Sequence, residues 1–169
     1  MAFDPALEDR ARRLVERYAA AGLKIVTAES CTGGLVAGLI TEIAGSSAVL
    51  ERGFVVYSNE AKVGLLGVAP ETLAAVGAVS AQTAREMAAG ALEHSRADIS
   101  VSITGVAGPG GGSAEKPVGL VHFACARRNG PVVHVERRFG DIGRSAVRRA
   151  AIEQALDLLE SALPASKPV

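Results

Sequence analysis

Two neighbouring nucleophilic side chains, Ser30 and Cys31, stand between an apolar run and a pair of glycines. The apolar run predicts a strand, and residues from Thr32 to about Ala44 predict a helix, so the pair lies at a strand-to-helix turn. Gly33 and Gly34 let the backbone approach a ligand closely, and the free amides of a first helical turn favour an anion or a developing oxyanion. The segment predicts a reactive site, although a plain strand-to-helix connection has the same pattern.

Two further segments carry polar and glycine-rich patterns. Residues 57–62 (YSNEAK) follow a second predicted strand, and residues 104–109 (TGVAGP) follow a third and continue through a glycine-rich loop to Gly119. The loop lacks the Gly-Lys-Ser/Thr of a Walker loop, and a strand follows it where a dinucleotide fingerprint has a helix. We therefore predict no ATP, no dinucleotide and no other cofactor.

Together with residues 28–34 (AESCTGG), these motifs resemble the CinA C-terminal domain family, from about Ala11 to Leu159. The resemblance implies an amidase, because stand-alone members hydrolyse nicotinamide mononucleotide to nicotinate mononucleotide and ammonia. One motif departs from the pattern: members often carry a compact Gly-Asp-Arg before the last helix, and this chain reads GDIGR at 140–144.

An amide is a poor electrophile, so its hydrolysis needs an activated nucleophile, a base and donors for the oxyanion. Ser30 supplies a hydroxyl. None of the three histidines is placed to activate it, because His94 lies late in a predicted helix and His122 and His134 lie in predicted strands. Lys62 is the remaining candidate base, in a Ser-Lys arrangement.

A lysine acts as a base only when its amine is neutral. Lowering the pKa of Lys62 from about 10.4 to near 7.4 costs about 4 kcal/mol, and burial and a helix amino end at Asn59 would both lower it. We expect Tyr57 to relay a proton or fix the amine, and backbone amides near Thr32 and Gly33 to hold the oxyanion.

Three alternatives remain open. Cys31 is a second candidate nucleophile, Glu29 could activate a water molecule, and the chain could be a catalytically silent nucleotide-binding module that serves a partner.

We expect the nucleotide substrate to contact residues of all three motifs and of the last helix: Cys31, Thr32, Gly33, Gly34, Asn59, Thr104, Gly105, Gly108 and Arg144. Arg144, Arg148 and Arg149 could clamp its 5′-phosphate, or they could form a solvated basic face.

The composition narrows the class of protein. Eighteen basic and eighteen acidic residues give zero net charge, so nothing draws the chain to nucleic acid or to an anionic membrane. The chain has no signal segment and no apolar run of membrane-spanning length, which predicts a cytoplasmic protein. Two cysteines, Cys31 and Cys125, are too few for a disulfide framework, and no cluster has metal-ligand spacing, so we predict no metal.

The elements that must position these residues alternate along the chain and predict an α/β fold, a three-layer α/β/α sandwich with a mixed sheet. We predict one domain, 1–169, with its core at about 5–162 and a frayed tail at 163–169; the resemblance implies the stand-alone form. An alanine-rich helix containing Gly90 suggests close packing against the sheet or another subunit, and we predict a homo-oligomer, a dimer or larger.

The first predicted helix begins at Pro5, is capped by Asp4 and ends at Gly22, and a short helix is capped by Asn59 and stopped by Gly67. The other predicted helices lie at 32–44, from Pro70, at 81–95 and at 144–159. Strands are predicted at 23–28, 52–58, 99–104, 118–126 and 132–139, with a hairpin turn at Asn129-Gly130.

Overall fold

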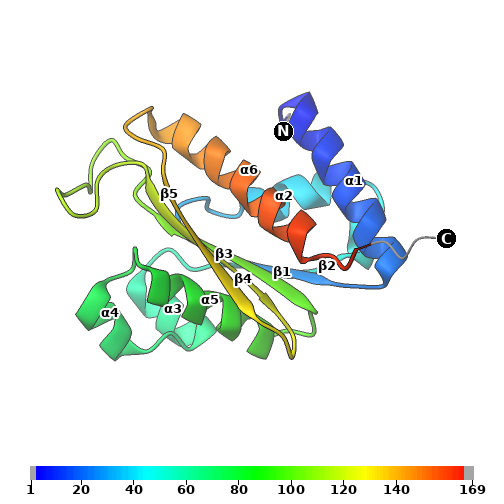
Figure 1. Ribbon diagram of the computed structural model, residues 1–169, viewed down its shortest axis with the longest axis horizontal. Helices are drawn as coiled ribbons and strands as arrows, with labels where there is room; N and C mark the ends of the chain where they lie inside the picture. The colour runs from blue at the N-terminus through cyan, green and yellow to red at the C-terminus, as the bar shows by residue number, and fades with distance from the viewer. Residues whose placement is uncertain (1–2, 166–169) are drawn as a thin grey trace.

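A computed structural model describes residues 3–165 of the chain (Figure 1). The helices are α1 (Pro5–Ala21), α2 (Leu35–Glu42), α3 (Asn59–Leu66), α4 (Pro70–Val76), α5 (Ala81–Glu93) and α6 (Arg144–Ala162), with a short 3-10 turn at Ser46–Ala48. The strands are β1 (Ile25–Glu29), β2 (Leu50–Val55), β3 (Ile99–Gly105), β4 (Leu120–Arg127) and β5 (Val132–Arg138).

The five strands form one mixed sheet in the order β2-β1-β3-β4-β5. β1 pairs in parallel with both β2 and β3, whereas β4 runs antiparallel to β3 and to β5. Helices α1, α2 and α6 cover one face of the sheet and α3, α4 and α5 cover the other (Figure 1). The predicted three-layer α/β/α sandwich with a mixed sheet is confirmed.

Several boundaries of helices and turns were predicted correctly from neighbouring residues in the sequence. Asp4 caps α1, Pro5 is its first residue, and Gly22 ends it in the left-handed conformation. Asn129, at φ 58°, and Gly130 form the predicted hairpin turn between β4 and β5. The cap of α3 differs, because the Ser58 hydroxyl accepts the Ala61 amide and Asn59 is the first helical residue.

Two apolar cores lie on opposite faces of the sheet. The larger one packs α1, α2 and α6 against it, and the smaller one packs α3 and α5. Gly90 of α5 is needed in the smaller core, because a Cβ there would lie 1.8 Å from the Leu66 carbonyl oxygen at the end of α3. The close packing predicted for this helix thus occurs within the chain. Leu163, which we placed in the tail, packs in the larger core, and residues 166–169 lie outside the described residues.

The strand order places a crevice at one edge of the sheet. From β1 the chain proceeds to β2 on one side and only later to β3 on the other, so β1 is the point at which the order reverses. In open α/β sheets, ligands bind beyond the carboxyl ends of the strands at such a point. The three sequence motifs follow the carboxyl ends of β1, β2 and β3.

Candidate active site

Ser30 and Lys62 meet at the carboxyl ends of β1 and β2. Ser30 follows β1 directly, and Lys62 lies in the first turn of α3, which begins four residues after β2 ends. The Nζ of Lys62 lies 3.1 Å from the Ser30 Oγ. The predicted nucleophile and the predicted base are therefore in contact.

The Lys62 amine has three oxygen partners. Besides Ser30, its Nζ donates to the Val56 carbonyl at 2.8 Å and to the Tyr57 carbonyl at 3.3 Å. A neutral amine has two N–H bonds and one lone pair. If the two carbonyls accept both hydrogens, the lone pair is directed at the Ser30 hydroxyl, which is the arrangement that a general base needs.

Burial lowers the pKa of Lys62 from its ordinary value of 10.5, against a smaller opposing influence of the Cys31 sulfur. The side chain is 1% exposed and has no carboxylate partner within salt-bridge distance among the described residues. Desolvation disfavours the charged ammonium, which increases the share of the amine that can accept a proton.

The turn after Ser30 leaves two backbone amides free. The Gly33 amide donates to the Ser30 carbonyl at 3.0 Å, which closes a β-turn with Cys31 and Thr32 as its central residues. In the described part of the chain, the amides of Cys31 and Thr32 donate no hydrogen bond to another residue. Of the two oxyanion donors that we predicted, the Gly33 amide is already engaged and the Thr32 amide is not.

The amino end of α2 is not free for a ligand, contrary to our prediction. The fully buried carboxylate of Glu29 accepts the amides of Gly34, Val36 and Ala37 at 3.1, 3.1 and 2.9 Å. A carboxylate at a helix amino end satisfies the unpaired amides and interacts favourably with the helix dipole. The Glu29 carboxylate therefore stabilises the start of α2. It is fully buried, so it has no exposed oxygen with which to activate water.

The paired glycines also have a different role from the predicted one. Gly33 and Gly34 have positive φ values, which favour glycine, and a Cβ at Gly34 would also press on the Val55 side chain. They serve the backbone of the turn, and neither lines the cavity beside Ser30.

That cavity has a volume of about 200 Å³. Its lining includes seven of the residues that the sequence predicted: Ser30, Cys31, Tyr57, Lys62, Thr104, Gly105 and Arg144. Four others lie outside it, namely Thr32, Gly33, Gly34 and Gly108. Asn59 is also outside, because it borders a separate shallow depression between α3 and α4.

Tyr57 and Arg144 stand at the mouth of the cavity. Tyr57 is 65% exposed, and its hydroxyl accepts a hydrogen bond from Arg144 at 3.4 Å, so the carbonyl of Tyr57 holds the lysine amine while the phenol does not. Arg144 also donates to the Gly108 carbonyl at 2.9 Å. Gly108 thus shapes the site by holding this guanidinium.

The three arginines at the start of α6 do not form one cluster. Arg144 faces the cavity, Arg148 donates to the carbonyls of Cys31 and Thr32, and Arg149 pairs with Asp4 and Glu153 on the outside. The predicted clamp of three arginines is therefore wrong. Arg148 lies one turn after Arg144 on the same face of α6, but its guanidinium is held by the turn, and Arg149 points away from that face.

The Cys31 thiol lines the same cavity, but it is poorly suited to nucleophilic attack. Burial raises its pKa to about 11, with Glu29 adding to the effect, so the thiolate is scarce at neutral pH. Among the described residues, the thiol has no base within hydrogen-bond distance, whereas Ser30 has Lys62.

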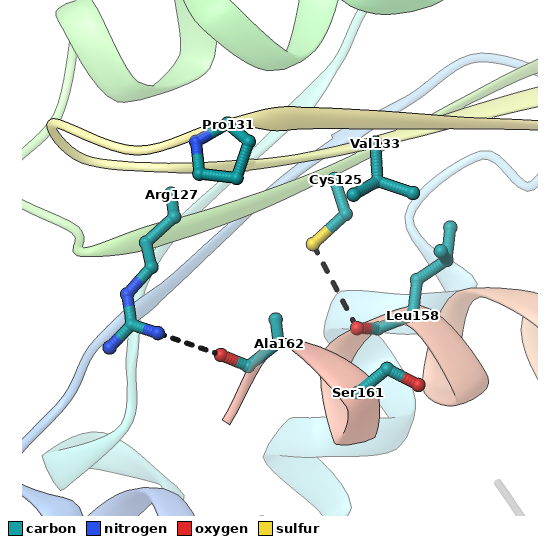
Figure 2. Close-up of a pocket in the computed structure, with 7 residues that line it drawn as sticks. All are labelled: Cys125, Arg127, Pro131, Val133, Leu158, Ser161 and Ala162. Atoms are coloured by element: carbon teal, nitrogen blue, oxygen red, sulfur yellow. Dashed lines mark hydrogen bonds between the residues drawn. The ribbon is translucent and has the colours of Figure 1, made fainter. Parts of the chain in front are cut away.

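A second pocket, of about 230 Å³, lies between the turn end of the β4–β5 hairpin and the end of α6 (Figure 2). Its Cys125 thiol points toward the Leu158 carbonyl, and burial raises the pKa of this thiol to about 12. β4 runs antiparallel to β3, and Arg127 pairs with Ile99 at the start of β3, so this pocket lies at the end of the sheet away from Ser30. It contains no nucleophile with a base.

Other features of the chain bear on its class. His122 and His134 stack on each other across β4 and β5, with Nδ1 and Nε2 2.9 Å apart, and neither lines the cavity beside Ser30. Within residues 3–165, no three His, Cys, Asp or Glu side chains are grouped to hold a metal. No helix in that range has the length and hydropathy of a membrane span.

The chain belongs to the CinA C-terminal domain family, whose model matches residues 7–163. The nicotinamide-nucleotide amidohydrolase PncC of Escherichia coli strain K12 is 54% identical over 157 residues, which cover 92% of this chain and 94% of that protein. A CinA-like protein from Anaeromyxobacter dehalogenans is 50% identical over 89% of this chain but only 36% of its own length. The family domain thus also occurs in longer proteins.

The fold agrees with solved structures of the family. The crystal structure of the competence/damage inducible protein CihA from Agrobacterium tumefaciens is 58% identical and superposes with a TM-score of 0.93, covering 95% of this chain and 98% of that one. A CinA superfamily protein from Escherichia coli superposes with a TM-score of 0.88 at 33% identity.

Sequence reasoning missed three residues that line the cavity, Ala78, Val79 and Ala107. Ala78 and Val79, which precede α5, line the cavity, and the Thr104 hydroxyl holds their segment through the Ala78 carbonyl at 2.8 Å. The sequence Ala78-Val79 contains no pattern that indicates a place beside the cavity. The inward course of Arg148 also has no sequence signal, because it depends on how α6 packs.

Proposed function

We propose that this chain is a nicotinamide-nucleotide amidohydrolase that converts nicotinamide mononucleotide to nicotinate mononucleotide and ammonia by a Ser-Lys mechanism. The observation that carries the proposal is the buried amine of Lys62, 3.1 Å from the Ser30 hydroxyl and held by two carbonyls. The 54% identity to the PncC protein over nearly the full length of both chains supports the substrate.

In this mechanism, Ser30 Oγ attacks the carboxamide carbon while its proton passes to the neutral amine of Lys62. The free amides of Cys31 and Thr32 hold the oxyanion that forms. The tetrahedral intermediate collapses when Lys62 returns the proton to the departing nitrogen, and ammonia leaves. Lys62 then takes a proton from a water molecule, which attacks the acyl-enzyme. The second tetrahedral intermediate collapses as Lys62 returns this proton to Ser30 Oγ, which releases nicotinate mononucleotide and restores the enzyme.

The size of the cavity indicates how the nucleotide enters. At about 200 Å³ it is smaller than the ~300 Å³ at which pockets for whole drug-sized ligands begin. The carboxamide and its ring therefore occupy the cavity, and the ribose phosphate extends over the mouth, where Arg144 is exposed.

The direct test is release of ammonia from nicotinamide mononucleotide by the purified chain, with the nucleotide product identified by chromatography. Binding of the nucleotide without turnover would contradict the proposal and favour a silent binding module.

Replacing Cys31 by Ala should leave kcat within about threefold of the parent, because the proposed nucleophile is the neighbouring hydroxyl. The measurement is steady-state ammonia release. Loss of turnover in a variant that still folds would transfer the nucleophile to the Cys31 thiol.

Replacing Arg144 by Ala should raise KM about 10-fold or more for nicotinamide mononucleotide but much less for nicotinamide riboside, which lacks the phosphate. A charge-assisted hydrogen bond contributes about 1.5–3 kcal/mol, which corresponds to that factor. Equal changes for both substrates would place the phosphate elsewhere.

The value of kcat/KM should rise with pH and then reach a plateau, and the pKa that describes this rise should lie below 10.5. The sign follows from the base: the protonated amine is inactive, and burial lowers the pKa of Lys62, so the active neutral form appears at lower pH than for an exposed lysine. The check is a pH series of initial rates at low substrate. A value of kcat/KM that falls as pH rises would exclude an amine base.

A further inference from the structure

The guanidinium of Arg148 touches the backbone of the nucleophile turn. From α6 its Nε donates to the Cys31 carbonyl at 3.1 Å, and its Nη2 donates to the Thr32 carbonyl at 3.3 Å. Arg148 does not line the cavity beside Ser30. Its contacts are therefore with the turn and not with a ligand in that cavity.

One of these contacts controls the direction of a free amide. The Cys31 carbonyl and the Thr32 amide belong to the same peptide unit, which is planar and trans, so the C=O and the N–H point in opposite directions. When Arg148 holds this carbonyl on the α6 side, the Thr32 N–H is fixed on the opposite side. That amide donates no hydrogen bond in the described part of the chain.

The rest of the turn is fixed as well. The Gly33 amide is tied to the Ser30 carbonyl, and the Glu29 carboxylate holds the first amides of α2. Arg148 makes the hydrogen bond that the Cys31–Thr32 peptide has within the described residues. Without Arg148, neither the carbonyl nor the amide of this peptide would be bonded there. Free rotation of that unit would misalign the amide, because an oxyanion donor must be aimed before the charge develops.

We propose that Arg148 is a positioning residue that holds the Cys31–Thr32 peptide of the nucleophile turn in the orientation that stabilisation of the oxyanion requires during amide hydrolysis. The inference rests on the proposed amidase function. The planar fork of arginine suits the task, because it spans two successive carbonyls, whereas the single ammonium of a lysine holds one of them less rigidly.

The test compares Arg148→Met with Arg149→Met, the same exchange one position further along α6. Arg149 pairs with Asp4 and Glu153 outside the site, so its variant controls for loss of an arginine from this helix. Arg148→Met should lower kcat for nicotinamide mononucleotide by about 10- to 100-fold with KM within about threefold, somewhat less than removal of a whole oxyanion donor. Arg148→Lys should recover part of the loss, and Arg149→Met should behave as the parent.

A second measurement separates positioning from a general structural role. The 3-aldehyde analogue of nicotinamide mononucleotide can form a hemiacetal: Ser30 Oγ bonds to the aldehyde carbon, the carbonyl electron pair moves to oxygen, and the hydroxyl proton passes to Lys62. Arg148→Met should weaken binding of this probe by the same factor as kcat, because the hemiacetal carries the oxyanion. Binding of the product nicotinate mononucleotide should not change.

An unchanged kcat in Arg148→Met, or a raised KM with normal kcat, would overturn the inference while ammonia release by the parent still upheld the proposed function. A parent that releases no ammonia would overturn both. If Arg148→Met does not fold, Arg148→Lys decides by the same criterion: a kcat equal to that of the parent, with equal affinity for the aldehyde, overturns the inference.

Discussion

Replacing Lys62 by Met should lower kcat by at least about 10²-fold and leave nucleotide binding nearly unchanged. Met retains much of the buried side-chain volume but removes the amine that takes the Ser30 proton, and general-base catalysis contributes about 10²–10⁴-fold. Ammonia release gives kcat, and titration with nicotinate mononucleotide gives the affinity. Lys24→Met, the same exchange just before β1 and at the other end of the sheet, is the matched control and should keep parental activity.

The same variant reports on the pKa of Lys62. Burial holds this pKa below the 10.5 of the exposed side chain, so between the two values the unfolded chain binds more protons than the folded one. The resulting loss of stability is complete below the folded pKa and disappears above the unfolded pKa. As the pH rises toward 10.5, the free energy of unfolding of the parent should therefore rise relative to that of Lys62→Met. Parallel denaturant titrations that keep a constant difference over this range would contradict a lowered pKa.

Elements whose boundaries depend on neighbouring residues were predictable from the sequence. Helix α1 needs only the Asp4 cap, Pro5 and an apolar face at helical spacing, and Gly22 stops it because glycine readily adopts the left-handed conformation. The cap of α3 was misplaced by one residue, since Ser58 and Asn59 are both good caps and the choice between them depends on where β2 releases the chain.

The site was predictable as a set of motifs but not as a geometry. Ser30 and Lys62 are 32 positions apart, and their contact requires the β1–β2 pairing and the turn at Ser58. The resemblance to the family supplied the pairing of these residues, which spacing alone does not give.

The errors at the site concern which backbone groups are already engaged. We took the first amides of α2 as free, because a helix amino end has unpaired donors, but the Glu29 side chain occupies them. A buried acidic residue at the end of an apolar strand, five residues before Gly34, is a signal that could have been used. The placement of the three arginines depends on the rotation of α6 about its axis, which no local pattern sets.

Ser30→Ala should lower kcat by at least about 10³-fold, and the double variant Ser30→Ala with Lys62→Met should be little slower than the worse single variant. Both residues serve one proton transfer, so once the hydroxyl is gone the amine has no proton to take, and losses within a catalytic unit do not add. Independent effects would multiply to about 10⁵-fold or more. The measurement is ammonia release by all three variants at saturating nucleotide.

A product of the two single losses would mean that Lys62 acts apart from Ser30, for example on the substrate itself. Near-normal turnover by Ser30→Ala would remove the hydroxyl from the mechanism altogether. In that case the Cys31→Ala variant would identify the nucleophile, because the Cys31 thiol is the other nucleophilic side chain at this turn that lines the cavity.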